Sequence, residues 1–257
     1  MSNSLSGESK NNFISLFCSW WYPILDFVYP INCRICFCKL DYKSLDSGTI
    51  CPDCWKKVEY LHLPYCLRCG HPAGDGFSEK CEECKKFRPV YFIKARGIAK
   101  YSGVLRKAIH FWKYGFKEEM KKPLVQIIEK YIQTNTELDS FDIIIPVPLH
   151  PIKFREREFN QAEILAEPFS DYFGIPVISD ILYRTRYTRP QMELSADERF
   201  KNVEGLFALR NPAIVNGKKI LLIDDVMTTG ATVNACSKVL KEAGCLDIYI
   251  VVLARGQ

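Results

Sequence analysis

Two adjacent carboxylates, Asp224 and Asp225, follow the apolar run ILLI near the C-terminal end of the chain. Such a run is typical of a buried strand, which would bring both carboxylates to the carboxyl edge of a sheet, where open α/β sheets bind ligands. A carboxylate pair accepts hydrogen bonds from vicinal hydroxyls. We therefore expect Asp224 and Asp225 to hold the hydroxyl groups of a ligand.

A loop rich in threonine comes directly after this pair and consists of Thr228, Thr229, Gly230, Ala231 and Thr232. Backbone N–H groups, three hydroxyls and a helix N-terminus would converge there, an arrangement that binds phosphate. Together with the carboxylates, the loop predicts a ribose 5-phosphate ligand. The alternative is that Asp225 is a cap and the threonines only form a turn. The P-loop and dinucleotide-binding glycine motifs are absent.

The cysteines show a second pattern with chemical meaning. Of 12 cysteines, eight form four Cys-x-x-Cys pairs: Cys33/Cys36, Cys51/Cys54, Cys66/Cys69 and Cys81/Cys84. Two residues between cysteines make a tight knuckle whose sulfurs both reach one zinc ion, and two knuckles complete a tetrahedron. The spacing predicts two structural zinc ribbons rather than disulfides or redox pairs.

The spacing alone leaves the pairing of the knuckles open. Sequential pairing, first with second and third with fourth, is favoured over an interleaved arrangement. Cys38 could compete as a ligand but is expected to be a spectator, while Cys18, Cys236 and Cys245 are expected to be small apolar residues. Reduced thiols with bound zinc indicate a cytoplasmic protein.

The overall charge is a weak guide to partners. The formal net charge is +5, but eight zinc thiolates and two Zn²⁺ would change it to about +1. The aromatic stretch 13–29 contains Pro23 and Asp26 and is too short for a transmembrane segment, so an amphipathic segment is expected over residues 1–29. A membrane-surface or partner-binding helix is the alternative.

The elements that must position these residues follow the Cys-rich segment 30–90. From residue 91 to 257 the chain alternates between strand and helix patterns. Short runs of Ile, Val and Leu predict parallel strands covered on both faces, within FDIIIPVPL, GIPVISDIL, KKILLID and DIYIVVLA. The order predicts an α/β fold with flanking helices. In the helix pattern that begins at Asn160, Pro168 predicts a kink.

The stretch LLIDDVMTTGAT resembles the PRPP-binding signature of type I phosphoribosyltransferases. The wider order of motifs resembles the ComF family, which is associated with DNA uptake in natural competence: paired zinc knuckles, HFWKYGF, PVPLHPIKFREREFNQAEILA, RTRYTRPQMELSADERFKNVEGLF and then the signature. This resemblance implies a type I phosphoribosyltransferase-like parallel sheet preceded by a small double zinc ribbon. Glu158 stands where such proteins often have glycine, and Pro168 is atypical.

The resemblance also implies roles for individual residues. Asp224 and Asp225 would hold the ribose 2′ and 3′ hydroxyls as catalytic residues, and Val226 and Thr228 to Thr232 would surround the 5′-phosphate. Pro148, Leu149 and His150 would form the pyrophosphate loop, and the stretch 188–202 would be a mobile loop over the reacting centre. The cations expected to meet pyrophosphate, together with Mg²⁺, are Lys113, Arg155, Arg157, Arg189 and Arg199.

Two functions from different classes stay open on the sequence. One is an active phosphoribosyltransferase that releases pyrophosphate from PRPP as a nitrogen base attacks the ribose; the sequence does not identify the base. The other is a non-catalytic protein, regulated by PRPP or a nucleotide, that binds single-stranded DNA or a competence helicase. The aromatic and basic residues of 111–117 suit DNA stacking, or equally an amphipathic helix against the sheet. The oligomeric state is undetermined.

Overall fold

The computed structural model describes residues 31–41, 49–72, 81, 82, 84, 89–115, 117–135, 140–188, 198 and 202–256. The expected amphipathic segment 1–29 lies outside this part of the chain. Among the described helices, none combines the length and the apolar character that crossing a membrane requires.

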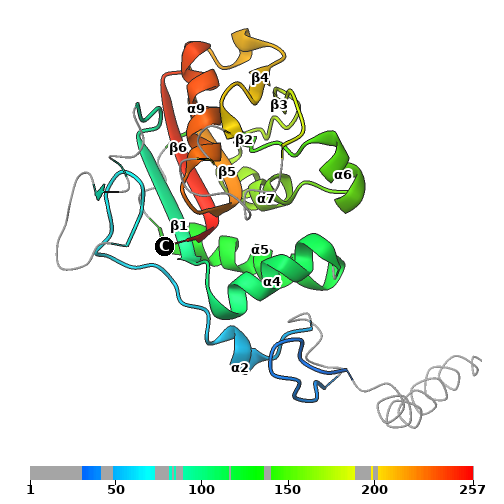
Figure 1. Cartoon of the computed structure of the whole chain (residues 1–257). Helices are drawn as coiled ribbons and strands as arrows, with labels where there is room; N and C mark the ends of the chain where they lie inside the picture. Colours follow the sequence, from blue (N-terminus) through cyan, green and yellow to red (C-terminus); the bar gives the residue numbers. More distant parts are fainter. Residues whose placement is uncertain are drawn as a thin grey trace, which may run out of the picture.

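Four parallel strands form the central sheet, in the order β1-β6-β5-β2 (Figure 1). The strands are β1 (Lys94–Lys100), β2 (Ile143–Pro146), β5 (Lys219–Met227) and β6 (Asp247–Arg255). The predicted α/β fold with a parallel sheet is confirmed. Strand β5 runs through both Asp224 and Asp225, rather than ending before them, because it stays in register with β6 as far as Met227.

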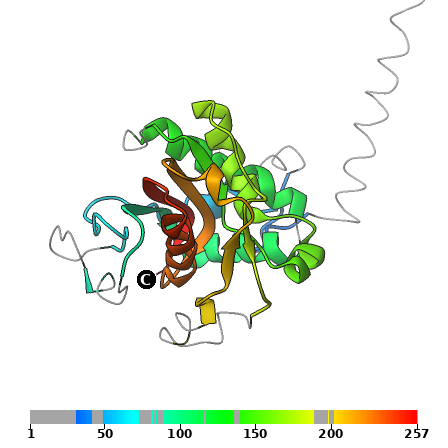
Figure 2. The ribbon, with the colours of Figure 1, turned by 90° about the horizontal axis from the view of Figure 1, so that it is seen from above.

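Helices cover both faces of this sheet. Helices α4 (Gly103–Tyr114), α5 (Lys117–Thr134) and α7 (Gln161–Phe173) share one apolar core, and α9 (Ala231–Glu242) belongs to the other. Side chains that alternate along β5 enter the two cores in turn: Leu221 and Ile223 face one, and Ile220 and Leu222 face the other. The view from above places α9 across the sheet from α4, α5 and α7 (Figure 2).

One local prediction needs correction. The stretch GIPVISDIL is not a strand of the central sheet: Val177 makes a single bridge to Ile144, and the chain then enters β3 (Leu182–Arg184), which pairs with β4 (Phe207–Leu209). Pro176 lacks the N–H that an extended ladder needs. Helix α7 contains Pro168 and continues from its cap at Asn160 to Phe173, before the left-handed Gly174, and the kink at Pro168 stays a prediction.

The Cys-rich segment packs closely on the sheet and on α4. The first part, which includes α2 (Pro52–Trp55), adds Cys51 and Cys54 to the core that α4 shares. The second part lies on β1, where the Ala95 N–H donates to the Arg68 carbonyl at 2.6 Å. A Cβ on Gly70 would lie 2.6 Å from the Ala95 oxygen, so this close approach requires glycine.

Candidate functional site

A cavity of about 270 Å³ lies at the carboxyl ends of β2 and β5. Its walls come from these two strand ends, from α4, from the start of α7 and from α6 (Pro151–Arg157), which follows β2. Most of the lining residues have polar side chains, and these include Lys113, Tyr114, His150, Lys153, Arg157, Asn160, Gln161, Arg184, Tyr187, Thr188, Asp224, Asp225, Thr228 and Thr232.

Asp224 and Asp225 both reach this cavity. The Asp225 N–H donates to Asp224 Oδ1 at 2.8 Å, and Asp225 Oδ2 lies 2.6 Å from Lys113 Nζ. Burial and the adjacent Asp225 carboxylate raise the pKa of the Asp224 carboxyl to about 7. The pair therefore places hydrogen-bond acceptors in the cavity. The Asp225 carboxylate is paired with Lys113, and the Asp224 carboxyl group titrates near neutral pH.

The threonine-rich loop joins β5 to α9 beside this pair. Gly230 adopts a left-handed conformation (φ +79°) at the N-cap of α9, and the Ala231 N–H donates to Thr229 Oγ1 at 3.4 Å. Val226, Thr228 and Thr232 line the cavity. Thr229, Gly230 and Ala231 are not among its lining residues, and they shape the turn that places the others.

The loop after β2 forms the opposite wall. Pro148, Leu149 and His150 line the cavity, and their contact with pyrophosphate stays a prediction. His150 caps α6, because its Nδ1 accepts the Ile152 N–H at 3.2 Å. Its ring also lies edge-on to the ring of Tyr187, with centroids 5.3 Å apart. His150 therefore has a clear structural role at this edge of the site.

The predicted cations divide into three groups. Lys113 and Arg157 line the cavity; Arg157 Nη2 donates to the Tyr114 hydroxyl at 3.3 Å and its Nη1 to Gln161 Oε1 at 3.2 Å. Arg155 is exposed on α6 and is not among the lining residues. Arg189 and Arg199 lie outside the described residues, as does most of the predicted mobile loop.

Several residues that line the cavity were not predicted from the sequence, among them Arg184 and Gln161; Arg255, which contacts the loop after β5, was not predicted either. Arg184 lines the cavity and donates from Nε to the Pro148 carbonyl at 3.0 Å; burial lowers its pKa. Gln161 is 1% exposed, and its Nε2 has no hydrogen-bond partner among the described residues. Arg255 donates to the carbonyls of Met227, Thr228 and Gly256.

Only weak signals could have identified these residues. Gln161 and Arg184 stand inside motifs quoted above, but polar residues near helix starts and strand ends are common. Arg255 lies at the end of an apolar strand, where a cation is unusual. Its target, the backbone of the loop after β5, is 27 residues away in the chain and is visible only in the fold.

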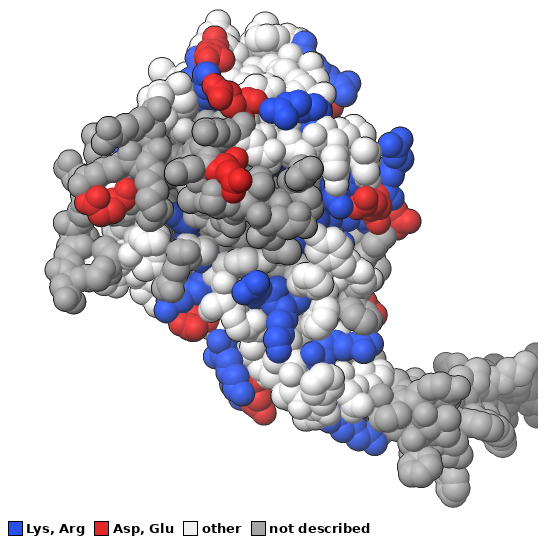
Figure 3. Space-filling view, in the orientation of Figure 1, with Lys and Arg blue, Asp and Glu red and all other residues white. Residues whose placement is uncertain are grey.

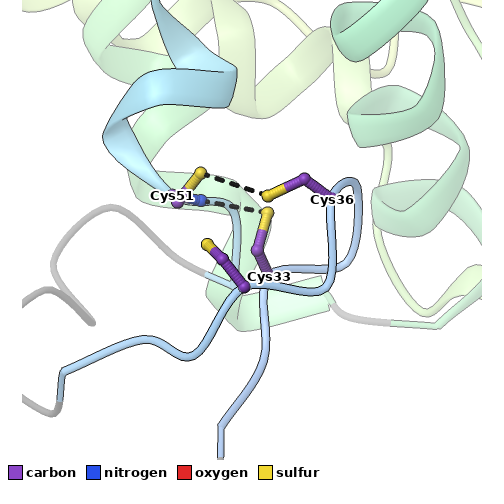
Figure 4. Close-up of side chains that lie close together, drawn as sticks. Cys33, Cys36 and Cys51 are labelled. Atoms are coloured by element: carbon purple, nitrogen blue, oxygen red, sulfur yellow. Dashed lines mark hydrogen bonds between the residues drawn. The ribbon is translucent and has the colours of Figure 1, made fainter.

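The cysteines form two clusters with sequential pairing of the knuckles. In the first, the sulfurs of Cys33 and Cys54 lie 3.8 Å apart and those of Cys36 and Cys51 lie 3.7 Å apart. Figure 4 shows the sulfurs of Cys33, Cys36 and Cys51 turned toward one another. In the second cluster the sulfur distances are 3.6 Å for Cys66 and Cys84 and 3.4 Å for Cys69 and Cys81.

These distances fit tetrahedral zinc. Zn–S bonds of about 2.3 Å hold the sulfurs of a tetrahedron about 3.8 Å apart. Against the raising effect of burial, backbone N–H groups lower the pKa of the Cys33 thiol to about 6. Burial and the neighbouring thiols raise the pKa of Cys81 to about 11. Adjacent thiolates repel one another, so a divalent cation is needed before all four can be charged together.

Cys38, expected from the sequence to be a spectator, lies beside the first cluster. Its sulfur belongs to a group, with those of Cys33, Cys36 and Cys51, in which all four lie within 4.8 Å of one another. The reason is the turn at Phe37, whose left-handed conformation (φ +61°) folds the chain back toward the first knuckle. Cys236 and Cys245 are buried, as expected of small apolar residues.

Family models match two parts of the chain. Residues 24–85 match the double zinc ribbon domain, and residues 160–257 match the phosphoribosyl transferase domain. The predicted order of a zinc ribbon before a phosphoribosyltransferase-type domain is confirmed.

Three relatives are similar over most of the chain. Competence protein F of Haemophilus influenzae is 29% identical over 232 residues, which cover 88% of this chain and 98% of that protein. The DNA utilization protein YhgH of Salmonella typhi is 29% identical over 88% of this chain and 97% of its own length. Competence protein ComFC of Streptococcus pneumoniae is 27% identical over 82% of this chain and 89% of its own length.

Proposed function

We propose that the chain, which matches the double zinc ribbon and phosphoribosyl transferase domains and is similar to competence protein F, transfers the phosphoribosyl group of PRPP to a nitrogen base and releases pyrophosphate. The observation that carries the proposal is one cavity that brings together a carboxylate pair, the end of a threonine loop and several cationic side chains. Each of these groups matches one part of PRPP: the ribose hydroxyls, the 5′-phosphate and the pyrophosphate.

The carboxylates are the proposed ribose contacts. Ribose hydroxyls donate hydrogen bonds, and the oxygens of Asp224 and Asp225 accept them. Lys113 holds Asp225 at 2.6 Å before ligand binding. A ribose hydroxyl that takes over this carboxylate would free Lys113 to turn to the pyrophosphate. In this exchange the Asp225 carboxylate stays hydrogen-bonded and the Lys113 cation gains an anionic partner.

The cations are the proposed stabilisers of the leaving group. In the reaction the bond from the ribose anomeric carbon to pyrophosphate breaks, a bond to the base nitrogen forms, and the base loses one proton. Lys113 and Arg157 line the cavity and would stabilise the charge that develops on pyrophosphate. The oxygen donors of Asp224 and Asp225 suit Mg²⁺, which when bound would neutralise further charge on PRPP.

The test is calorimetric titration of the zinc-loaded protein with PRPP and MgCl₂. The Asp224→Asn/Asp225→Asn double variant is compared with Asp171→Asn, which changes an exposed carboxylate on α7 that does not line the cavity. Pyrophosphate release is followed in the same samples with a panel of nucleobases. We expect binding in the wild type and in Asp171→Asn, loss of binding in the double variant, and base-dependent release.

The possible results separate the hypotheses. Binding without release from any base would reject the transferase and favour a protein regulated by PRPP. No binding by wild-type protein that holds its zinc would reject the assignment of the cavity itself.

A non-catalytic role in binding single-stranded DNA is the second candidate. The names of the relatives refer to competence and DNA utilization. In the view of Figure 3, Lys and Arg side chains lie on the surface over α4 and the first zinc ribbon. The exposed cations of α4 and of the chain around the first zinc cluster include Arg34, Lys39, Lys56, Lys57, Arg106 and Lys107.

Salt-dependent binding of a fluorescent single strand tests this role. Lys56→Gln/Lys57→Gln would lower the slope of log affinity against log salt by about 1.4, or about 0.7 for each lost phosphate contact. The control, Lys238→Gln on α9, would leave the slope unchanged. An equal slope in all three proteins would reject this surface as a DNA contact.

A further inference from the structure

The first zinc cluster contains one thiol more than zinc needs. Five cysteines gather there, Cys33, Cys36, Cys38, Cys51 and Cys54, whereas the second cluster contains four among the residues that the structure describes. The second cluster therefore provides an internal standard for a ribbon with a single set of ligands.

Two possible sets of four ligands can be drawn from the five cysteines. Both sets contain the sulfurs of Cys33, Cys36 and Cys51. Cys54 Sγ lies 3.8 Å from Cys33 Sγ, and Cys54 also contacts Cys36 and Cys51. Cys38 Sγ lies within 4.8 Å of the sulfurs of the same three residues. The group with all sulfurs within that distance contains Cys38 and not Cys54. Two thiols thus compete for one corner of the same tetrahedron.

The two competing thiols differ in their surroundings. Cys54 is 1% exposed and packs into the core shared with α4, whereas Cys38 is exposed. The backbone holds Cys38 at the cluster, because the Cys33 N–H donates to the Cys38 carbonyl at 2.8 Å and the Phe37 N–H donates to the Cys33 carbonyl at 2.9 Å. The Cys38 sulfur lies 4.8 Å or less from the other three sulfurs, and the edge of a zinc–sulfur tetrahedron is about 3.8 Å. The Cys38 sulfur therefore needs to shift by only about 1 Å to become a ligand.

We infer that Cys38 is an exchangeable fourth ligand of the first zinc site, which alternates with Cys54. When Cys38 binds, its thiol loses a proton to solvent and a Zn–S bond forms; the bond to Cys54 breaks and the Cys54 thiolate takes up a proton. Zinc keeps four thiolates and no redox partner is needed. The exposed Cys38 also gives the first site a route for metal exchange, whereas the described cysteines of the second site include no fifth thiol.

Zinc content of the full-length protein tests the inference. Wild-type protein and Cys38→Ser should each hold two zinc ions per chain. Cys54→Ser should also hold two, because Cys38 replaces the lost ligand. The double variant Cys38→Ser/Cys54→Ser should hold one. The matched control is Cys84→Ser, which removes the last cysteine of the second ribbon, and it should hold one. Retention of only one zinc by Cys54→Ser would overturn the inference.

A second measurement does not depend on Cys54→Ser, which could fail to fold because Cys54 is buried. Wild-type protein and Cys38→Ser, which alters only an exposed side chain, are loaded with natural zinc and exposed to ⁶⁷Zn. Removal of Cys38 should slow exchange at the first site at least threefold and leave the second site unchanged. Equal exchange rates at the first site in the two proteins would overturn the inference.

Discussion

At the level of single residues, the Asp224 carboxyl group controls the proposed ribose site. Its pKa is raised to about 7 by burial and by Asp225. Since the carboxylate is the form that accepts two hydroxyl hydrogen bonds, PRPP affinity should rise with pH and be about tenfold lower at pH 6 than at pH 8. Calorimetry in matched buffers measures this ratio of affinities. The Asp224→Asn variant should bind PRPP weakly. Its affinity should also depend less on pH than that of the wild-type protein, because the titrating carboxyl group is absent.

Folding stability should respond to the same group in the opposite direction. In the unfolded chain Asp224 titrates near its ordinary pKa of 3.8. Between about pH 4 and pH 7 the folded state therefore binds more protons, so the contribution of this group to stability falls as pH rises through that window. We expect Asp224→Asn to be more stable than wild-type protein at pH 8 in urea denaturation. A lower stability at that pH would contradict the raised pKa.

The ion pair between Lys113 and Asp225 is also a residue-scale feature. Both side chains are largely buried, with 19% and 11% exposure, so a lost partner leaves a poorly solvated charge. Lys113→Met should lower the free energy of unfolding by about 1–3 kcal/mol. Asp225→Asn in the same background should recover part of this loss. A double-mutant cycle in urea measures the coupling, and additive effects would show that the pair contributes little.

At the level of elements, the end of α6 carries a local strain. Glu158 follows the helix in a left-handed conformation (φ +67°), at a position where glycine is the common residue at helix ends. Glu158→Gly should stabilise the protein by about 1 kcal/mol, because glycine adopts this conformation without a steric cost. Glu156→Gly, in the same helix, should destabilise it by about 1 kcal/mol. Thermal unfolding measures the change in stability of each variant. Stability changes of the same sign in Glu158→Gly and Glu156→Gly would contradict this account.

The loop between β5 and α9 depends on Arg255 at the end of β6. This side chain is 2% exposed and donates to the Met227 carbonyl at 3.0 Å and to the Gly256 carbonyl at 2.9 Å. Arg255→Met should lower stability by about 2–4 kcal/mol, since buried carbonyls lose a charged donor. It should also weaken PRPP binding, as the Thr228 carbonyl is one of its acceptors. Arg106→Met, an exposed control on α4, should change neither quantity.

At the level of the whole molecule, the zinc ribbons share apolar cores with the sheet. Cys54 packs with the helices on one face, and Cys66 packs with the residues of the other. Removal of zinc should therefore lower the Tm of the whole chain and not only unfold residues 30–90. Scanning calorimetry with and without a chelator measures this. An unchanged main transition in zinc-free protein would show that the ribbons fold independently of the sheet.

The chemical groups were largely predictable from the sequence, because they depend on short-range spacing. The gap between Cys33 and Cys36 sets the reach of a knuckle, and the run before Asp224 is apolar on both faces of its strand. Local turn chemistry was also readable at Gly230, which has a positive φ. These features need contacts only between residues close in the chain.

What the tertiary structure decided was which distant groups meet. It paired Lys113 with Asp225, directed Arg255 to the loop after β5, and drew Cys38 into the first zinc cluster. It also left Arg155 outside the cavity, although Arg157, two residues away, lines it. The sequence determines which side chains a strand or helix can offer. Only the packing of helices on the sheet fixes which of them share a buried space, because that depends on contacts summed over the whole chain.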